Sequence, residues 1–105
     1  MSKSSVIRVT HRALGAMLRL TVAEGLSFDL TLEEARTLAR ALAAVRNGNS
    51  NVDEIYMSPI ASDGDFSAKV TPDGLLLDAR KPPLRLAWPE VSEIAGALAE
   101  LAGEG

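Results

Sequence analysis

The sequence predicts an α+β fold, a two-layer sandwich in which two helices cover one face of a mainly antiparallel sheet of six or seven strands. Three observations support this prediction: apolar residues with a period of two, apolar residues with a helical period, and a second half that repeats the order of patterns in the first. The chain has 105 residues, of which 47% are hydrophobic, so it is long enough for one domain with a single core.

Strand patterns fill the first 30 residues. Residues 16–22 and 26–30 alternate apolar with polar side chains, as strands with one buried face do, and the Gly-containing link at residues 23–25 predicts a hairpin. Residues 6–10 are predicted to form a third strand, joined to the hairpin through residues 11–15. The predicted inward-facing residues of the hairpin are Leu18, Leu20, Val22, Leu26, Phe28 and Leu30.

The pattern then changes to that of a helix. Apolar residues recur every three or four positions from Leu32 to Val45, in a stretch rich in Ala, Glu and Arg. Thr31 followed three residues later by Glu34 predicts a capping box, in which each side chain binds a backbone amide at the start of the helix. The polar residues 47–51 predict that the helix ends there.

The second half of the chain repeats this order of turn, strand and helix, so we predict a tandem β-β-β-α repeat. A shift of 49 residues places residues 24–26 on residues 73–75, and a shift of 56 residues places the first helix on the second. The seven-residue difference lies between Leu75 and Leu84, where it adds a longer hairpin or one more strand. The predicted organisation is a flexible N-terminus (1–5), a first unit (6–46), a linker loop (47–51), a second unit (52–102) and a frayed tail (103–105).

The second helix is expected to begin differently from the first. Pro89 suits a first helical turn, where its missing N–H costs nothing, but Ala87 stands where the first helix has a capping Thr. Gly96 falls in the middle of this helix, at a cost of about 1 kcal/mol relative to Ala. We interpret Gly96 as a site of close packing between the two Ala-rich helices.

Composition excludes several classes of function. The chain has no Cys and one His, which rules out disulfides, thiolate metal sites and a cysteine nucleophile. No apolar run approaches the roughly 20 residues that cross a bilayer, and the N-terminus does not resemble a signal peptide. These features predict a soluble, cytoplasmic protein without membrane contact.

Charge is divided unevenly along the chain. Residues 1–50 carry seven basic and four acidic side chains, whereas residues 51–105 carry four basic and ten acidic ones, for a net charge of −3. Such a division can direct partner binding or head-to-tail self-association. It also fits two solvated surfaces that neutralise each other.

No motif for catalysis, cofactor binding or metal binding is present in the sequence, so we expect no enzymatic activity and no cofactor. A nucleophilic serine would need His11 as its base, and the sequence has no strand-to-helix Gly-x-Ser-x-Gly segment. Residues 63–65 (Asp-Gly-Asp) resemble the start of a calcium loop, but Lys69 stands at a ligand position and Gly74 where a bidentate Glu is required. This segment is interpreted as a turn.

Binding to another protein is the leading functional hypothesis. Leu75-Leu76-Leu77 breaks the alternation, so Leu76 should emerge on the polar sheet face, where Met17 joins it, and Ile60 lies in a predicted loop. The opposing interpretation is that residues 80–83 cover Leu76. We therefore expect an adaptor, regulator or inhibitor that acts by occupying a surface, as phage and mobile-element accessory factors do, with homodimers formed through a sheet edge or sheet face.

Two alternatives remain open. The first is a dimeric nucleic-acid-binding transcriptional regulator, which would use Arg8, Arg12, Arg36 and Arg40 to contact phosphates, with Tyr56 as the one candidate for base stacking. A sequence pI near 5.1 and the lack of a basic run argue against it. The second is a small-ligand site between the helices and the sheet, with Trp88 at its edge.

Overall fold

The computed structural model describes residues 4–48, 51–62, 64–78 and 82–103. The elements, in chain order, are β1 (Ser5–His11), β2 (Gly15–Ala23), β3 (Leu26–Thr31), α1 (Leu32–Arg46), β4 (Glu54–Met57), β5 (Phe66–Thr71), β6 (Gly74–Leu77), β7 (Leu84–Ala87) and α2 (Trp88–Leu101). Ser5 already belongs to β1, and the rest of the predicted flexible N-terminus and frayed tail falls largely on residues 1–3 and 104–105, outside the described residues.

The strands form two sheets, so the α+β class is confirmed and the prediction of one continuous sheet is wrong. One sheet has the order β1-β2-β3 and the other the order β4-β5-β6-β7, and every pairing is antiparallel. The outer edge of β3 is not available to β4, because the hydroxyl of Ser62 occupies it. Ser62 Oγ accepts a hydrogen bond from Asp29 N at 2.7 Å and donates one to Asp29 O at 3.2 Å.

The two halves of the chain have a similar order of strands and helix but differ in the number of strands. Each ends in a strand that runs directly into a helix, β3 into α1 and β7 into α2. The second half has four strands, and the segment between Leu75 and Leu84 that lacks a counterpart in the first half contains the connection from β6 to β7. The tandem β-β-β-α repeat therefore stays a prediction.

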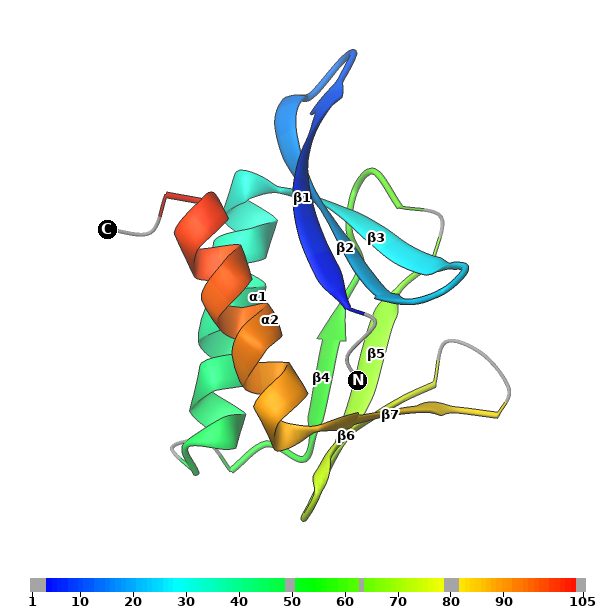
Figure 1. Ribbon diagram of the computed structural model, residues 1–105, viewed down its shortest axis with the longest axis vertical. Coiled ribbons are helices and arrows are strands. Elements are labelled where there is room, and N and C mark those ends of the chain that lie inside the picture. Colours follow the sequence, from blue (N-terminus) through cyan, green and yellow to red (C-terminus); the bar gives the residue numbers. More distant parts are fainter. Residues whose placement is uncertain (1–3, 49–50, 63, 79–81, 104–105) are drawn as a thin grey trace.

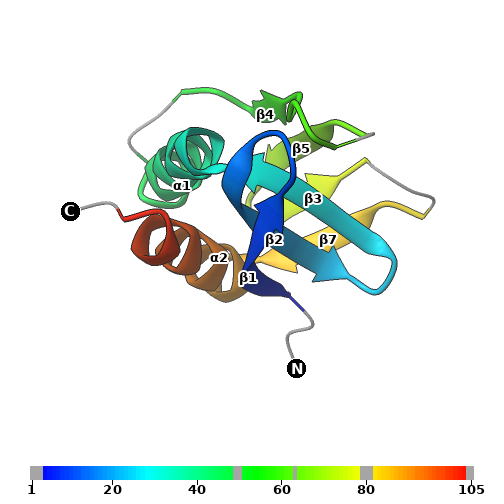
Figure 2. The same ribbon diagram turned by 90° about the horizontal axis from the view of Figure 1, so that it is seen from above.

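Both sheets and both helices share one core. Figures 1 and 2 show α1 and α2 side by side on one side of the molecule, with the sheets on the other. The inner faces of the two sheets meet at Phe28 and Phe66, whose ring centroids lie 5.4 Å apart at an interplanar angle of 68°. Such an edge-to-face pair contributes about 0.5–1.5 kcal/mol beyond the burial of its area. The core thus contains buried residues from both halves of the chain.

Specific residues stabilise the start of each helix. The predicted capping box of α1 is confirmed, because Thr31 Oγ1 accepts from Glu34 N at 3.0 Å and Glu34 Oε1 accepts from Thr31 N at 2.9 Å. The N-cap of α2, Ala87, has no side-chain cap, and Pro89 lies in the first turn, as the sequence predicted. The Trp88 indole fixes this junction instead, since its Nε1 donates to Pro72 O at 2.9 Å.

The interpretation of Gly96 as a close-packing site is wrong. Gly96 is exposed, and a Cβ added there would meet nothing within 4 Å. The close approach is at Gly74 in β6, where an added Cβ would overlap the backbone carbonyl of Leu86 in β7. Gly74 also has a φ of +152°, a conformation that other residues rarely adopt.

We predict opposite effects of alanine at these two glycines. Gly74→Ala should lower the free energy of unfolding by more than about 3 kcal/mol, because the new methyl collides with the β7 backbone, which cannot move without breaking the sheet. Gly96→Ala should be neutral or stabilising by up to about 1 kcal/mol, since it removes a helix-interior glycine. Urea unfolding of both variants checks this, and equal effects would contradict the described packing.

Candidate functional site

The three residues predicted to form a protein interface do not share one exposed surface. Met17 in β2 is 1% exposed, so its assignment to an exposed face is wrong. It pairs with Thr31 at the strand-to-helix junction and borders a hollow next to Leu32 and Leu101, so the ends of the helices cover it. Ile60 is 70% exposed, as predicted.

Leu76 emerges on the outer face of its sheet, as the broken alternation predicted, but it is only half-buried and not prominent. Its neighbours across the sheet are Lys69 on β5 and Arg85 on β7, both exposed. An apolar residue between two long basic side chains is a common arrangement on a solvated sheet face. The predicted cover by residues 80–83 falls partly on residues 79–81, outside the described residues.

The exposed apolar side chains gather instead around β4. Within the described part of the chain, five large apolar side chains are exposed, and three of them, Val52, Tyr56 and Ile60, lie between residues 52 and 60. Tyr56 is 63% exposed and belongs to β4, whereas Val52 and Ile60 lie just before and just after it. We call Val52, Tyr56, Ile60 and the outer edge of β4 the β4 surface. The sequence signal that was missed is the spacing of these three residues by four positions.

Among the strands that the structure describes, β4 pairs with β5 alone, so its outer edge is not paired with another strand. Asp53 O accepts from Val70 N at 2.8 Å, so the backbone groups of Asp53 point toward β5. These groups alternate in direction along an antiparallel strand, so those of Glu54 and Tyr56 point away from the sheet. The β4 surface therefore combines outward backbone donors and acceptors with exposed apolar side chains.

The loop between β4 and β5 is held to the start of α1 and to β3 by hydrogen bonds. Ile60 N donates to Glu34 Oε2 at 3.1 Å, and Glu34 Oε1 is engaged in the capping box of α1. Two residues further on, Ser62 binds the edge of β3 at Asp29. Asp29 is in turn fixed by a bidentate ion pair with Arg19, with Nε–Oδ1 at 2.8 Å. This pairing lowers the pKa of Asp29 below its ordinary value. These bonds place Ile60 on a framework that is ordered before any partner arrives.

Tyr56 also borders a polar cleft between the two sheets. Its hydroxyl donates to Asp65 Oδ2 at 2.6 Å. This hydrogen bond raises the pKa of Tyr56, because the phenolate would face a carboxylate, and it lowers the pKa of Asp65. The cleft has a volume of about 580 Å³ and is lined by Gly25, Leu26, Ser27, Phe28, Tyr56, Gly64, Asp65, Ser67 and Asp78. Its carboxylate and hydroxyl groups are suited to accept hydrogen bonds from a cationic or amide group.

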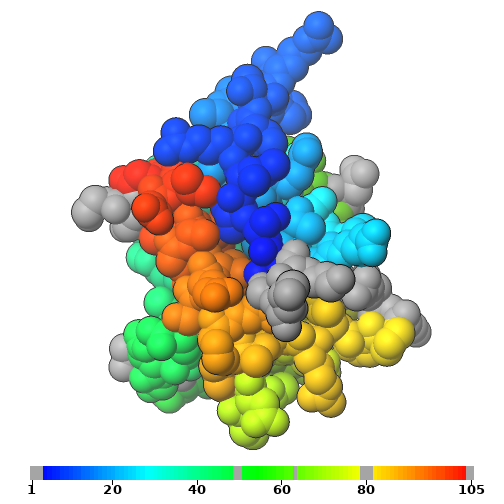
Figure 3. Space-filling view, in the orientation of Figure 1, coloured from blue at the N-terminus to red at the C-terminus, as the bar shows by residue number. Residues whose placement is uncertain are grey.

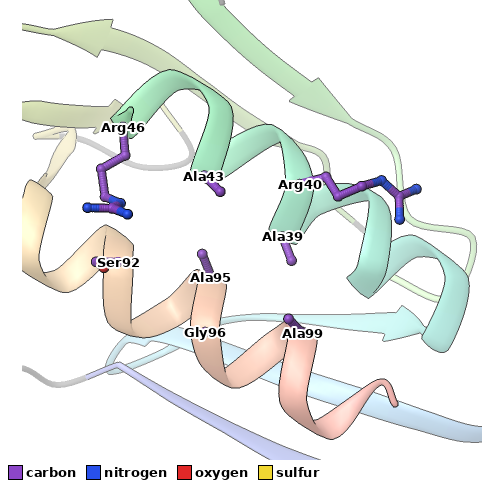
Figure 4. A pocket seen from close by; sticks show the side chains of 8 residues that line it. All are labelled: Ala39, Arg40, Ala43, Arg46, Ser92, Ala95, Gly96 and Ala99. Atoms are coloured by element: carbon purple, nitrogen blue, oxygen red, sulfur yellow. The ribbon is translucent and has the colours of Figure 1, made fainter. Parts of the chain in front are cut away.

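The four arginines predicted to contact nucleic acid do not form one surface free for phosphate. Arg36 Nη1 donates to Ala102 O at 2.6 Å, so it supplies the cation that the last turn of α2 lacks. Arg8 lies on β1 beside the hollow near Leu101. Arg12 lies in the β1–β2 turn, which projects from the body of the molecule in Figure 3. Arg40 lies on α1, at the rim of a groove between the helices (Figure 4).

Trp88 does not line that groove, and its indole Nε1 donates to Pro72 O. The small-ligand site between the helices and the sheet stays a prediction. His11 is engaged in its own turn, where Nδ1 accepts from Ala13 N and Leu14 N, both at 3.1 Å. Among residues whose placement is described, no three His, Asp or Glu side chains are grouped as a metal site would require. Asp63 of the calcium-like segment lies outside them.

No protein-family model, curated protein sequence or solved structure matches this chain. Of the two helices that the structure describes, neither is long and apolar enough to cross a membrane. A functional proposal must therefore come from the surfaces themselves.

We predict that the phenol of Tyr56, the one tyrosine of the chain, titrates above its ordinary pKa of about 10. Asp65→Asn should bring this pKa down, because the uncharged amide no longer opposes formation of the phenolate. Ultraviolet absorbance of tyrosinate against pH measures it directly. Asp53→Asn, a matched change outside the Tyr56 hydrogen bond, should leave the titration unchanged. An unaltered titration in Asp65→Asn would contradict the described contact.

Proposed function

We propose that the chain is a non-enzymatic protein-binding module that takes an extended segment of another protein along the β4 surface. It would act in the cytoplasm as an adaptor, regulator or inhibitor by occupying a binding surface of its partner. The observation that carries the proposal is the coincidence of an available strand edge with Val52, Tyr56 and Ile60, three of the exposed large apolar side chains of the described residues. A free edge gives affinity through main-chain hydrogen bonds, and neighbouring side chains give specificity.

The comparison of sheet edges favours β4 over the others. The edge of β3 is occupied by Ser62, and β1 packs beside α2 and has one exposed large apolar residue, Ile7. β7 alternates Leu84 and Leu86, directed to the core, with exposed Arg85 and Ala87. β7 therefore exposes no large apolar side chain, whereas β4 exposes Tyr56.

The polar cleft supports a more specific form of the proposal. Tyr56 belongs both to β4 and to the cleft, so its side chain connects the strand to Asp65, and a long side chain of a segment paired with β4 would reach Asp65 across it. A Lys or Arg side chain on that segment would find a carboxylate whose pKa is already lowered. The proposed partner segment is therefore extended, apolar toward Tyr56 and Ile60, and basic at one position.

Site-specific photo-cross-linking in the native host tests this proposal. A photoreactive phenylalanine analogue at Tyr56 or Ile60 should capture one protein, whereas the same analogue at Thr37, which is exposed on α1, should not. Ile60→Asp should abolish capture from position 56, because it places a charge in the apolar contact. Glu54→Pro should do the same, because it removes an outward N–H while leaving the β4–β5 ladder intact.

Each other result has a definite meaning. Capture that disappears after nuclease treatment, or that weakens steeply with salt, would favour the nucleic-acid alternative and contradict the proposal. Equal capture from positions 37 and 56 would show that the β4 surface has no special role. Circular dichroism of every variant must match the wild-type spectrum, so that loss of capture is not loss of fold.

A further inference from the structure

A second surface, on the opposite side of the molecule from the sheets, is formed by α1 and α2 together. Between the helices lies a groove of about 340 Å³, lined by Ala39, Arg40, Ala43, Arg46, Ser92, Ala95, Gly96 and Ala99 (Figure 4). The helices run antiparallel, as the hydrogen bond from Arg36 near the start of α1 to Ala102 at the end of α2 requires. Figure 4 shows Arg46 across from Ser92 at one end of the groove and Ala39 across from Ala99 at the other.

The centre of this helix face is open. Gly96 is exposed, and space for a side chain is vacant in front of it. The glycine lowers helix propensity by about 1 kcal/mol without allowing any close contact within the chain. A second helix could approach the backbone of α2 closely at this point.

The charges on the two sides of the groove have opposite sign. On α1, Arg40 and Arg46 are exposed and line the groove. On α2, Glu93 and Glu100 do not line the groove itself, but they are exposed, directly follow the lining residues Ser92 and Ala99, and lie three and four residues from Gly96 on its face of the helix. The acidic residues of α1, by contrast, are confined to its first turn and do not line the groove.

From this arrangement we infer that the helix face binds a second copy of this chain in a symmetric dimer. A two-fold axis parallel to the helices lays α1 of one copy across α2 of the other, at the same height along the axis. Arg46 then faces the Ser92–Glu93 end of its partner. An axis across the helices would instead place α1 on α1, with arginines opposed, so the charge pattern selects the first arrangement.

This surface is distinct from the β4 surface, so the dimer neither requires nor excludes the proposed partner. It also differs from the sheet-edge and sheet-face homodimers predicted from the sequence. Because its charge pairs are exposed, the association should weaken as salt screens them.

Sedimentation velocity over a range of protein concentrations, in low and high salt, tests the inference. The wild-type chain should show a monomer–dimer equilibrium that shifts toward monomer in high salt. Arg46→Glu and Glu93→Lys should each raise the dissociation constant by roughly tenfold or more, because each creates two symmetric like-charge contacts. The double variant should recover most of the affinity, because it restores both pairs with their signs exchanged.

Two further variants distinguish a dimer formed through the helix face from a dimer formed through another surface. Gly96→Leu should fold, since its side chain enters open space, yet should be monomeric because that space belongs to the partner. Arg85→Glu, a charge reversal on β7, should leave the equilibrium unchanged. A wild-type chain that is monomeric at its highest soluble concentration in low salt would overturn the inference. So would a dimer that is insensitive to Gly96→Leu, or a double variant no tighter than the singles.

Discussion

The arrangement of the molecule depends on a short set of hydrogen bonds between the β4–β5 loop and the junction of β3 with α1. The carboxylate of Glu34 binds Thr31 N through one oxygen and Ile60 N through the other, so a helix cap and a distant loop share one side chain. Ser62 then satisfies both backbone groups of Asp29. These bonds occupy the edge of β3 at Asp29 and Thr31, and the strands of the second half form a separate sheet.

The edge of β3 is occupied, whereas the outer edge of β4 is not paired with another strand. Since β4 cannot continue the first sheet, it becomes the edge of the second, and the loop that closes β3 also fixes Ile60 beside it. The buried aromatic pair of Phe28 and Phe66 holds the two sheets over one core. The β4 surface therefore follows from the same contacts that divide the strands, and its order does not depend on a partner.

Local features of the fold could be predicted from the sequence, whereas the pairing of distant segments could not. The β2–β3 hairpin, α1 and its capping box depend on residues within a few positions of one another. The contact at the edge of β3, by contrast, joins Ser62 to Asp29, which are 33 residues apart. Met17 was misplaced for a similar reason, since alternation gives the face of a strand but not what covers it. Leu32 and Leu101, from the two helices, border Met17.

The candidate surfaces were predicted only in part. Ile60 was identified because an apolar residue in a polar loop is visible in the sequence, but Tyr56 was considered only for base stacking, because its edge position depends on the sheet division. Arg36 was read as a phosphate contact, although its partner, Ala102 O, is 66 residues away. Gly96 was interpreted as a packing glycine because both helices are rich in small residues, although the buried stripe of α2, Val91, Ile94, Ala95 and Leu98, does not include it.

Hydrogen exchange measured by NMR tests the central claim most directly, namely that the edge of β3 is closed and that of β4 is open. The amide of Asp29 should be protected although β3 is an edge strand, and Ser62→Ala should remove that protection. The amides of Glu54 and Tyr56 should exchange quickly, while that of Ile55, between them, should be protected by β5. Fast exchange at Asp29 together with protection at Glu54 and Tyr56 would contradict the account, because it would mean that the strand edges are arranged in the opposite way.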